Sequence, residues 1–223
     1  MAADAARMTG AVDDRLALFA GLCDEARACR RCPAMEGRRR VLSSANGLPG
    51  ATILFIGEAP GRHGGERTGI PFSGDQTGRN FSRLLDLAGI RRADIFVTNA
   101  VLCNPRDACG RNRAPSRAEL AACQGFLARQ LAIVGPPIVA PLGAVALAAL
   151  GRIAPHGLTL REAVGHPHPW QGRLLVPLYH PGPRAQLHRP FSRQCADFAA
   201  LARLALSEVE GLTSSIAQRT GRE

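Results

Sequence analysis

Short apolar runs alternate along the chain with longer segments of helical periodicity. The apolar runs lie at 52–56, 95–102, 138–142 and 174–179, and helical patterns at 81–87, 117–134 and 144–150 separate them. Continuous apolar runs of this length are typical of parallel strands that are buried on both faces. The alternation therefore predicts an α/β fold: three α/β/α layers around a central, mainly parallel, four-stranded sheet.

The two ends of the chain differ from this alternation. Residues 11–28 carry apolar side chains at near-helical spacing, which predicts a helix that leads into a pair of cysteines. From residue 207 the sequence becomes polar, and we expect it to fray after one last helix. A length of 223 residues suits one domain, here 1–206, followed by a polar C-terminal tail, 207–223. Neither a membrane-spanning run nor a signal peptide is visible, so we expect a cytoplasmic protein without a membrane partner.

The positive charge of the chain comes entirely from arginine. The formal net charge is +10, and no lysine occurs. Guanidinium groups are permanently charged planar forks that suit phosphate, so the excess favours DNA or another polyanion as partner. A coding bias that replaces Lys by Arg explains the missing lysines but leaves the excess unexplained.

Cysteine spacing indicates a candidate metal site. The chain has seven cysteines, which a cytoplasmic protein keeps reduced. Cys29 and Cys32 form a Cys-x-x-Cys pair, Cys103 follows a predicted strand, and Cys123 lies in the next predicted helix. Four such thiolates suit either a [4Fe–4S] cluster or a tetrahedral zinc ion. Cys103 and Cys123 also fit ordinary buried thiols, and Cys109 is an alternative fourth ligand.

Candidate chemical groups follow the predicted strands, where parallel sheets form their ligand sites. Glu58 lies in a Gly/Pro loop after the first strand, and the glycine-rich run 63–75, too rich in glycine for a helix, offers Phe72 and Asp75. Asn99 is a polar amide in an apolar strand, and His180 lies among prolines after the last strand. Taken singly, each residue also fits a turn or a satisfied structural group.

Two further stretches have ambiguous patterns. The segment 104–116 reads as a long loop, and loops of this length are usually functional or disordered. His166 and His168 have the spacing of metal ligands, although a surface turn accounts better for the prolines around them.

Together and in this order, these segments resemble the uracil-DNA glycosylase superfamily, and the four cysteines resemble its iron–sulfur families, numbered four and five. The likeness covers roughly residues 25–200. The loop 57–61 with its Glu58 matches the first signature motif in its family-four form, whereas 63–75 looks more like family five. Asn99 matches the uracil-reading asparagine of families one and four. The run 180–183 matches the second signature motif, with Gly182 where Ser is common.

This resemblance implies a DNA-repair enzyme that flips uracil out of DNA and hydrolyses its N-glycosidic bond, leaving an abasic site. It implies a [4Fe–4S] cluster. We expect a monomer, the default for a protein that must wrap one DNA site. The implied roles are catalysis by Glu58, His180 and Asp75; substrate binding by Ala59, Phe72 and Asn99; DNA binding by Arg184, Leu187, Arg38 and Arg39; and cluster ligation by Cys29, Cys32, Cys103 and Cys123.

Three alternatives stay open at this point. The segment that ends in Asp75 suggests a glycosylase of broader range, which also excises hypoxanthine or xanthine. A non-catalytic iron–sulfur module that binds DNA is the second alternative, and a structural zinc protein is the third. A related covalent branch uses a histidine in the long loop, but 106–116 contains none, so we predict no covalent adduct.

Overall fold

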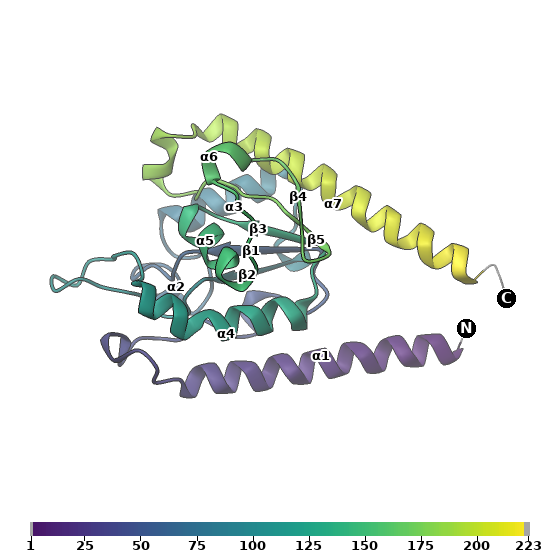
Figure 1. The fold of residues 1–223 in the computed structure, drawn as a ribbon, viewed down its shortest axis with the longest axis horizontal. Helices are drawn as coiled ribbons and strands as arrows, with labels where there is room; N and C mark the ends of the chain where they lie inside the picture. The colour runs from purple at the N-terminus through teal and green to yellow at the C-terminus, as the bar shows by residue number, and fades with distance from the viewer. Residues whose placement is uncertain (1, 221–223) are drawn as a thin grey trace.

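A single five-stranded sheet forms the centre of the computed structural model, which describes residues 2–220 and the side chains of 13–208 (Figure 1). The strand order is β2-β1-β3-β5-β4. Strands β1, β2, β3 and β5 run parallel, and β4 pairs with β5 in the antiparallel sense. The strands are β1 (Ile53–Gly57), β2 (Ile95–Asn99), β3 (Ile138–Pro141), β4 (His168–Trp170) and β5 (Arg173–Leu175).

The predicted α/β/α architecture is confirmed, but the predicted number of four strands is wrong. The fifth strand, β4, comes from the segment that the sequence assigned to a surface turn. Proline cannot donate a backbone hydrogen bond, so prolines at 167 and 169 weaken the strand signal. Because β4 lies at the edge of the sheet, Pro169 has a neighbour on one side alone, where it is paired with Leu174.

Helices cover both faces of the sheet. Leu54 and Ile56 of β1 contribute to the core beneath α1 (Ala2–Ala28), α4 (Arg117–Val134) and α5 (Ala144–Ile153). Ile53 and Phe55 point to the opposite face, beneath α3 (Gln76–Ala88) and α7 (Phe191–Thr220). This alternation is the two-residue period of a strand, and burial on both faces explains the continuous apolar run.

Other elements depart from the sequence predictions. Helix α1 begins at Ala2, well before the predicted start, and α7 continues to Thr220, so the described part of the predicted tail is helical. The division into domain and tail stays a prediction. A short helix, α2 (Gly65–Thr68), lies within the glycine-rich run, and α6 (Leu160–Ala163) precedes β4. Within residues 2–220, no helix is both long and apolar enough to cross a membrane.

The parallel register brings the first two strand ends together. Gly57, the last residue of β1, is paired with Asn99, the last residue of β2. The loops that leave these strands therefore start side by side. The loop before α4 projects from the same region, on the left of Figure 1.

Candidate active site

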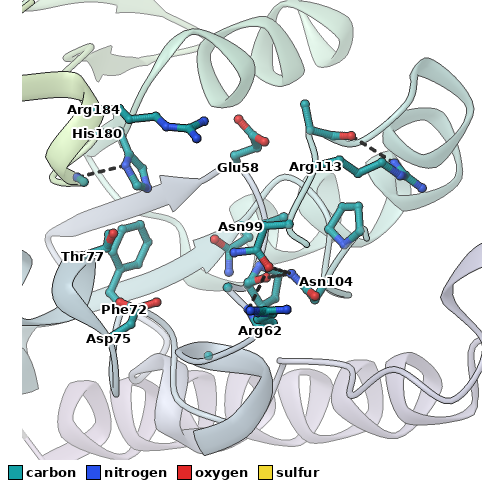
Figure 2. Close-up of a pocket in the computed structure, with 18 of the residues that line it drawn as sticks. Glu58, Arg62, Phe72, Asp75, Thr77, Asn99, Asn104, Arg113, His180 and Arg184 are labelled. Carbon is teal, nitrogen blue, oxygen red and sulfur yellow. Dashed lines mark hydrogen bonds between the residues drawn. The ribbon is translucent and has the colours of Figure 1, made fainter. Parts of the chain in front are cut away.

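A cavity of about 870 Å³ opens where β1 and β2 end (Figure 2). Its walls come from the loops after β1 and β2, the N-terminus of α3 and the loop at 180–185. All the residues with predicted catalytic or substrate-binding roles line this one cavity: Glu58, Ala59, Phe72, Asp75, Asn99 and His180. The structure thus brings together residues that are up to 122 positions apart in the sequence.

The floor of the cavity depends on the absence of a side chain at Gly57. A Cβ atom there would lie 2.4 Å from Oδ1 of Asn99 and 2.8 Å from two ring carbons of Phe72. Phe72 has a φ of 54°, an uncommon backbone conformation for a non-glycine residue. Its ring packs on Phe81, with the centroids 4.8 Å apart. Gly57 therefore lets an aromatic face and an amide meet at the strand ends.

Asn99 is a buried polar group without an evident structural task. The residue is 2% exposed. Among the described residues, no group forms a hydrogen bond with its side-chain amide. Its amide atoms do not belong to the fully enclosed, unpartnered side-chain atoms, because Asn99 lines the open cavity. The amide therefore offers one donor and one acceptor side to whatever occupies the cavity.

His180 is held as a neutral imidazole that can donate from Nε2. The backbone N–H of Gly182 donates to Nδ1 at 3.1 Å, so Nδ1 carries no proton. Burial lowers the pKa of His180, and the negative charge of Asp75 opposes this shift only in part. The imidazole centroid lies 5.8 Å from that of Phe72. Asn80 of α3 donates to the carbonyl of Pro181 at 2.7 Å, which ties the loop to the helix.

The two candidate carboxylates have different surroundings. Asp75 is the N-cap of α3: its Oδ1 accepts from the N–H of Gly78 at 2.9 Å. Its Oδ2 packs against the backbone, because a Cβ on Gly64 would lie 2.3 Å from it. Glu58 is partly buried, and this burial raises its pKa. Within the part of the chain that the structure describes, the Glu58 carboxylate has no hydrogen-bond partner, so it is the freer of the two.

The residues predicted to bind DNA lie in two places. Arg184 lines the cavity, and Leu187, in the same short 3-10 helix (Pro183–Leu187), is 83% exposed at the surface. Arg38 and Arg39 do not line the cavity. They lie on the segment after the first cysteine pair, where Arg39 donates to the carbonyl of Arg67 at 3.1 Å.

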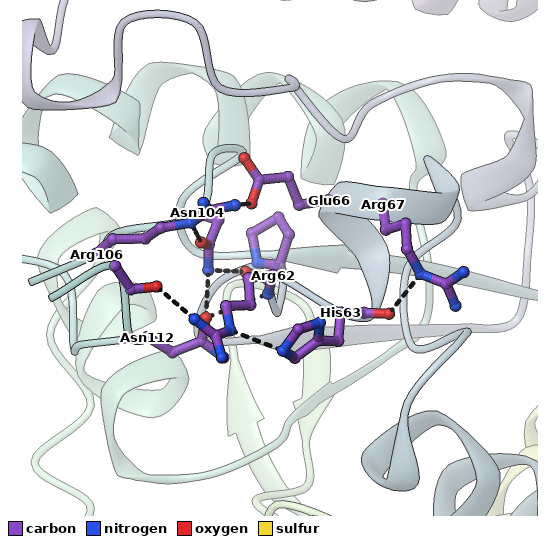
Figure 3. A network of polar contacts seen from close by, with 9 residues as sticks. Arg62, His63, Glu66, Arg67, Asn104, Arg106 and Asn112 are labelled. Carbon is purple, nitrogen blue, oxygen red and sulfur yellow. Dashed lines mark hydrogen bonds and ion pairs between the residues drawn. The ribbon is translucent and has the colours of Figure 1, made fainter.

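The long loop forms one wall of the cavity, and a network of polar contacts joins it to the segment after β1 (Figure 3). Asn104 is 1% exposed and donates to the carbonyl of Pro60 at 2.6 Å and to Oδ1 of Asn112 at 3.0 Å. Arg106 donates to Oδ1 of Asn104 at 2.7 Å and forms an ion pair with Glu66 of α2. Sequence reasoning marked this loop as functional or disordered but assigned no role to its residues. Cavity-lining residues that it missed are Arg62, Thr77, Asn104, Arg111, Asn112 and Arg113.

The four predicted ligand cysteines line a second, small apolar cavity between α1 and α4. Leu102 donates its backbone N–H to Sγ of Cys123 at 3.4 Å. Burial raises the pKa of Cys103 to about 11 and that of Cys123 to about 12. Thiols of this kind ionise when a bound metal supplies positive charge. The alternative ligand Cys109 is exposed in the long loop and does not line this cavity.

The thiols surround a space instead of converging on one point. Within the described residues, no three His, Cys, Asp or Glu side chains are placed to hold a single metal ion. His166 and His168 accordingly belong to no such group. Four cysteines around one cavity, with a backbone N–H directed at a sulfur, fit the ligand requirements of a polynuclear iron–sulfur centre.

Fold and cavity together define an α/β protein that presents an aromatic ring, a free amide and a neutral histidine at its strand ends. The sequence matches the model of the family described as the uracil DNA glycosylase superfamily over residues 45–204. This match covers more than half of the chain, so the chain belongs to that superfamily, as the motifs predicted.

Relatives of two types match the chain. A type-4 uracil-DNA glycosylase of Thermotoga maritima is 33% identical over 159 residues, 71% of this chain and 78% of the relative. A second type-4 enzyme, from Sulfurisphaera tokodaii, is 29% identical over 82% of this chain and 83% of its own length. A type-5 uracil-DNA glycosylase of Thermus thermophilus is 33% identical over 187 residues, 69% of this chain and 82% of the relative. The predicted mixture of family-four and family-five features is thus confirmed.

Proposed function

We propose that this chain is a uracil-DNA glycosylase of DNA repair, which flips uracil out of DNA and hydrolyses its N-glycosidic bond. The observation that carries the proposal is the Asn99 amide, which lines the same cavity as Phe72 and His180 and has no hydrogen-bond partner among the described residues. The type-4 relatives bear the name of this activity, which supports the assignment.

Base binding uses the floor of the cavity. Extruding a base costs a few kcal/mol, and the cost is smallest for a mispaired base such as uracil opposite guanine. Phe72 stacks on the flipped uracil, and the Asn99 amide hydrogen-bonds its O4 and N3–H edge. The backbone around Glu58 and Ala59 contacts O2. A cytosine presents a donor and an acceptor in the opposite order, so Asn99 excludes it.

Bond cleavage uses groups preorganised for the charges that develop. As the bond between C1′ and N1 breaks, the electron pair moves to uracil and the sugar becomes cationic. The Nε2–H of His180 donates to O2 of the anionic uracil. Water adds to C1′ and transfers its proton to Glu58, whose carboxylate also stabilises the sugar cation. Asp75 is the second candidate for this role, although its cap contacts favour Glu58.

Contacts with the DNA backbone surround the cavity. Arg184 or the exposed Leu187 fills the gap that the flipped base leaves, and Arg38 and Arg39 contact phosphates further along the strand. The protein would hold a [4Fe–4S] cluster through Cys29, Cys32, Cys103 and Cys123. The cluster would cross-link the chain segments that bear these residues and would take no part in bond cleavage. Absorbance near 400 nm separates this cluster from a zinc ion, which does not absorb there.

A base-release assay tests the proposal. Anaerobically purified protein is incubated with labelled oligonucleotides that contain uracil, hypoxanthine or xanthine, and alkali then cleaves abasic sites. Scission with uracil alone supports the type-4 assignment. Scission with purines as well supports a broader glycosylase, the second candidate, which the type-5 relative and the Asp75 segment favour. Binding without scission by the wild type refutes the enzyme assignment.

The Asn99→Asp variant tests the base-reading role. An aspartate loses the amide donor, so the variant is expected to discriminate less against cytosine than the wild type does. Discrimination that stays at the wild-type level removes Asn99 from that role, whatever the overall activity.

A further inference from the structure

The long loop 104–116 is attached at both ends to the cysteine cavity. Cys103 directly precedes the loop, and Cys123 lies in α4, which directly follows it. Both thiols line the same cavity, and the N–H of Leu102 donates to Sγ of Cys123. The body of this loop forms a wall of the base cavity. One segment therefore lies between the two sites.

An ion pair also joins the two cavities. Arg113 lines the base cavity, and Glu119 lines the cysteine cavity. The guanidinium of Arg113 binds the Glu119 carboxylate in a bidentate manner, at 2.8 Å and 2.6 Å. Such fork-to-fork contacts fix orientation as well as distance. The pair thus joins the wall of one site to the wall of the other.

Each partner is also fixed to its own surroundings. Nε of Arg113 donates to the carbonyl of Arg106 at 3.0 Å, within the loop. Glu119 accepts from the N–H of Ser116 at 2.7 Å and completes the capping box of α4. Glu119 is 7% exposed and precedes Cys123 by four residues, so both lie on one face of the helix. A shift of Cys123 would move Glu119 with it.

We infer that the Arg113–Glu119 pair is a positioning link that makes the wall of the base cavity depend on the state of the cysteine site. With the site loaded, the first turn of α4 is held, and Arg113 keeps the loop against the cavity. With the site empty, that turn and the loop loosen together. The consequence for DNA rests on the proposed function, but the coupling itself does not.

Hydrogen exchange measured by mass spectrometry tests the coupling on the full chain without DNA. Exchange in 104–116 is compared between the loaded protein and protein emptied by ferricyanide and EDTA. In the wild type, emptying is expected to speed exchange in this loop by about 5–150-fold, the range of typical couplings between sites. In the Arg113→Gln/Glu119→Gln double variant, exchange is expected to be fast already and to change little on emptying.

A matched control breaks a different ion pair in the same loop. Asp107 binds Nε of Arg111 at 2.8 Å, and it lines neither cavity. The Asp107→Asn variant is expected to loosen the loop tip yet keep the wild-type response to emptying. If the double variant fails to bind metal, the Arg113→Gln single variant is used instead. It breaks the ion pair without changing a residue that lines the cysteine cavity.

The outcomes separate the inference from the proposed function. A wild-type response to emptying in the Arg113 variants overturns the inference, as does a wild-type protein that holds no metal when purified anaerobically. A lost response, with metal content and absorbance near 400 nm unchanged, supports it. If the wild type shows the coupling but releases no base from any oligonucleotide, the proposed function fails and the link stands.

Discussion

Adding one methyl group at Gly57 is expected to disable base binding while the fold survives. A Cβ there would lie 2.4 Å from Oδ1 of Asn99, whereas ordinary contact begins near 3.4 Å. The amide must therefore retreat by about 1 Å, and a misplacement of about 1 Å at a reacting site costs about 100-fold in rate. The same Cβ meets the Phe72 ring at 2.8 Å. Overpacking of this kind costs about 1–3 kcal/mol of stability.

The Gly57→Ala variant is compared with Gly125→Ala in α4, where nothing lies within 4 Å of an added Cβ. Neither glycine has a positive φ, so alanine fits both backbones. Single-turnover release of uracil is measured with thermal denaturation alongside. A rate drop of about 100-fold in the first variant, with a cooperative transition in both, is expected. A Gly57→Ala rate within about threefold of wild type, far short of that drop, would refute the argument that this glycine sets the positions of Asn99 and Phe72.

Three other variants test the charged and titrating groups. Burial raises the pKa of Glu58. The contribution of Glu58 to the stability of the fold is therefore fully present below the ordinary carboxyl pKa and is lost as the pH rises through the raised pKa. Glu58→Gln is thus expected to raise Tm at neutral pH but not near the ordinary carboxyl pKa, and to slow base release by about 10²–10⁴-fold; an unchanged rate removes Glu58 from catalysis. His180→Phe removes a preorganised donor, so single-turnover release should fall by about 10²–10³-fold, and a smaller loss argues against direct contact with O2. Asp75→Asn keeps a good N-cap, so Tm and rate should both stay near wild type; a large rate loss at constant Tm would make Asp75 catalytic instead.

Hydrophobic periodicity predicted the layers of the fold because the strands of the sheet are buried on both faces. The runs at 52–56 and 138–142 each became a strand within one residue of the expected bounds. The short edge strand β4 escaped prediction, since an edge position tolerates proline and a three-residue strand gives little periodicity. Helix α7 continued past the last clear pattern, where the sequence offers neither glycine nor proline until Gly211.

Polar residues at or after the end of a buried apolar run were the part of the site that sequence could predict. Glu58, Asn99 and His180 stand out because a polar group at the end of a buried apolar run needs a partner, and a ligand at the sheet edge can supply one. Gly57 and Asn104 gave no comparable signal, because their importance depends on contacts between distant segments. Asn104, for example, bonds to the carbonyl of Pro60, 44 residues away.

Two buried asparagines show the difference between a residue that holds the wall of the cavity and a residue that offers free polar atoms to it. Asn104 and Asn99 are 1% and 2% exposed, so burial alone does not distinguish them. Asn104 has its donors and acceptor bonded to three different residues, and any movement of it would break bonds that hold the loop. Asn99 has no such bonds to the residues that the structure describes, so its amide is free to bond to a group in the cavity. Asp75 and Glu58 differ in the same way, since the Asp75 carboxylate caps a helix and the Glu58 carboxylate lines the cavity without a partner in the described part of the chain. Under the proposed function, these free polar groups within a well-bonded frame are the reason to place the flipped base between Asn99 and Glu58.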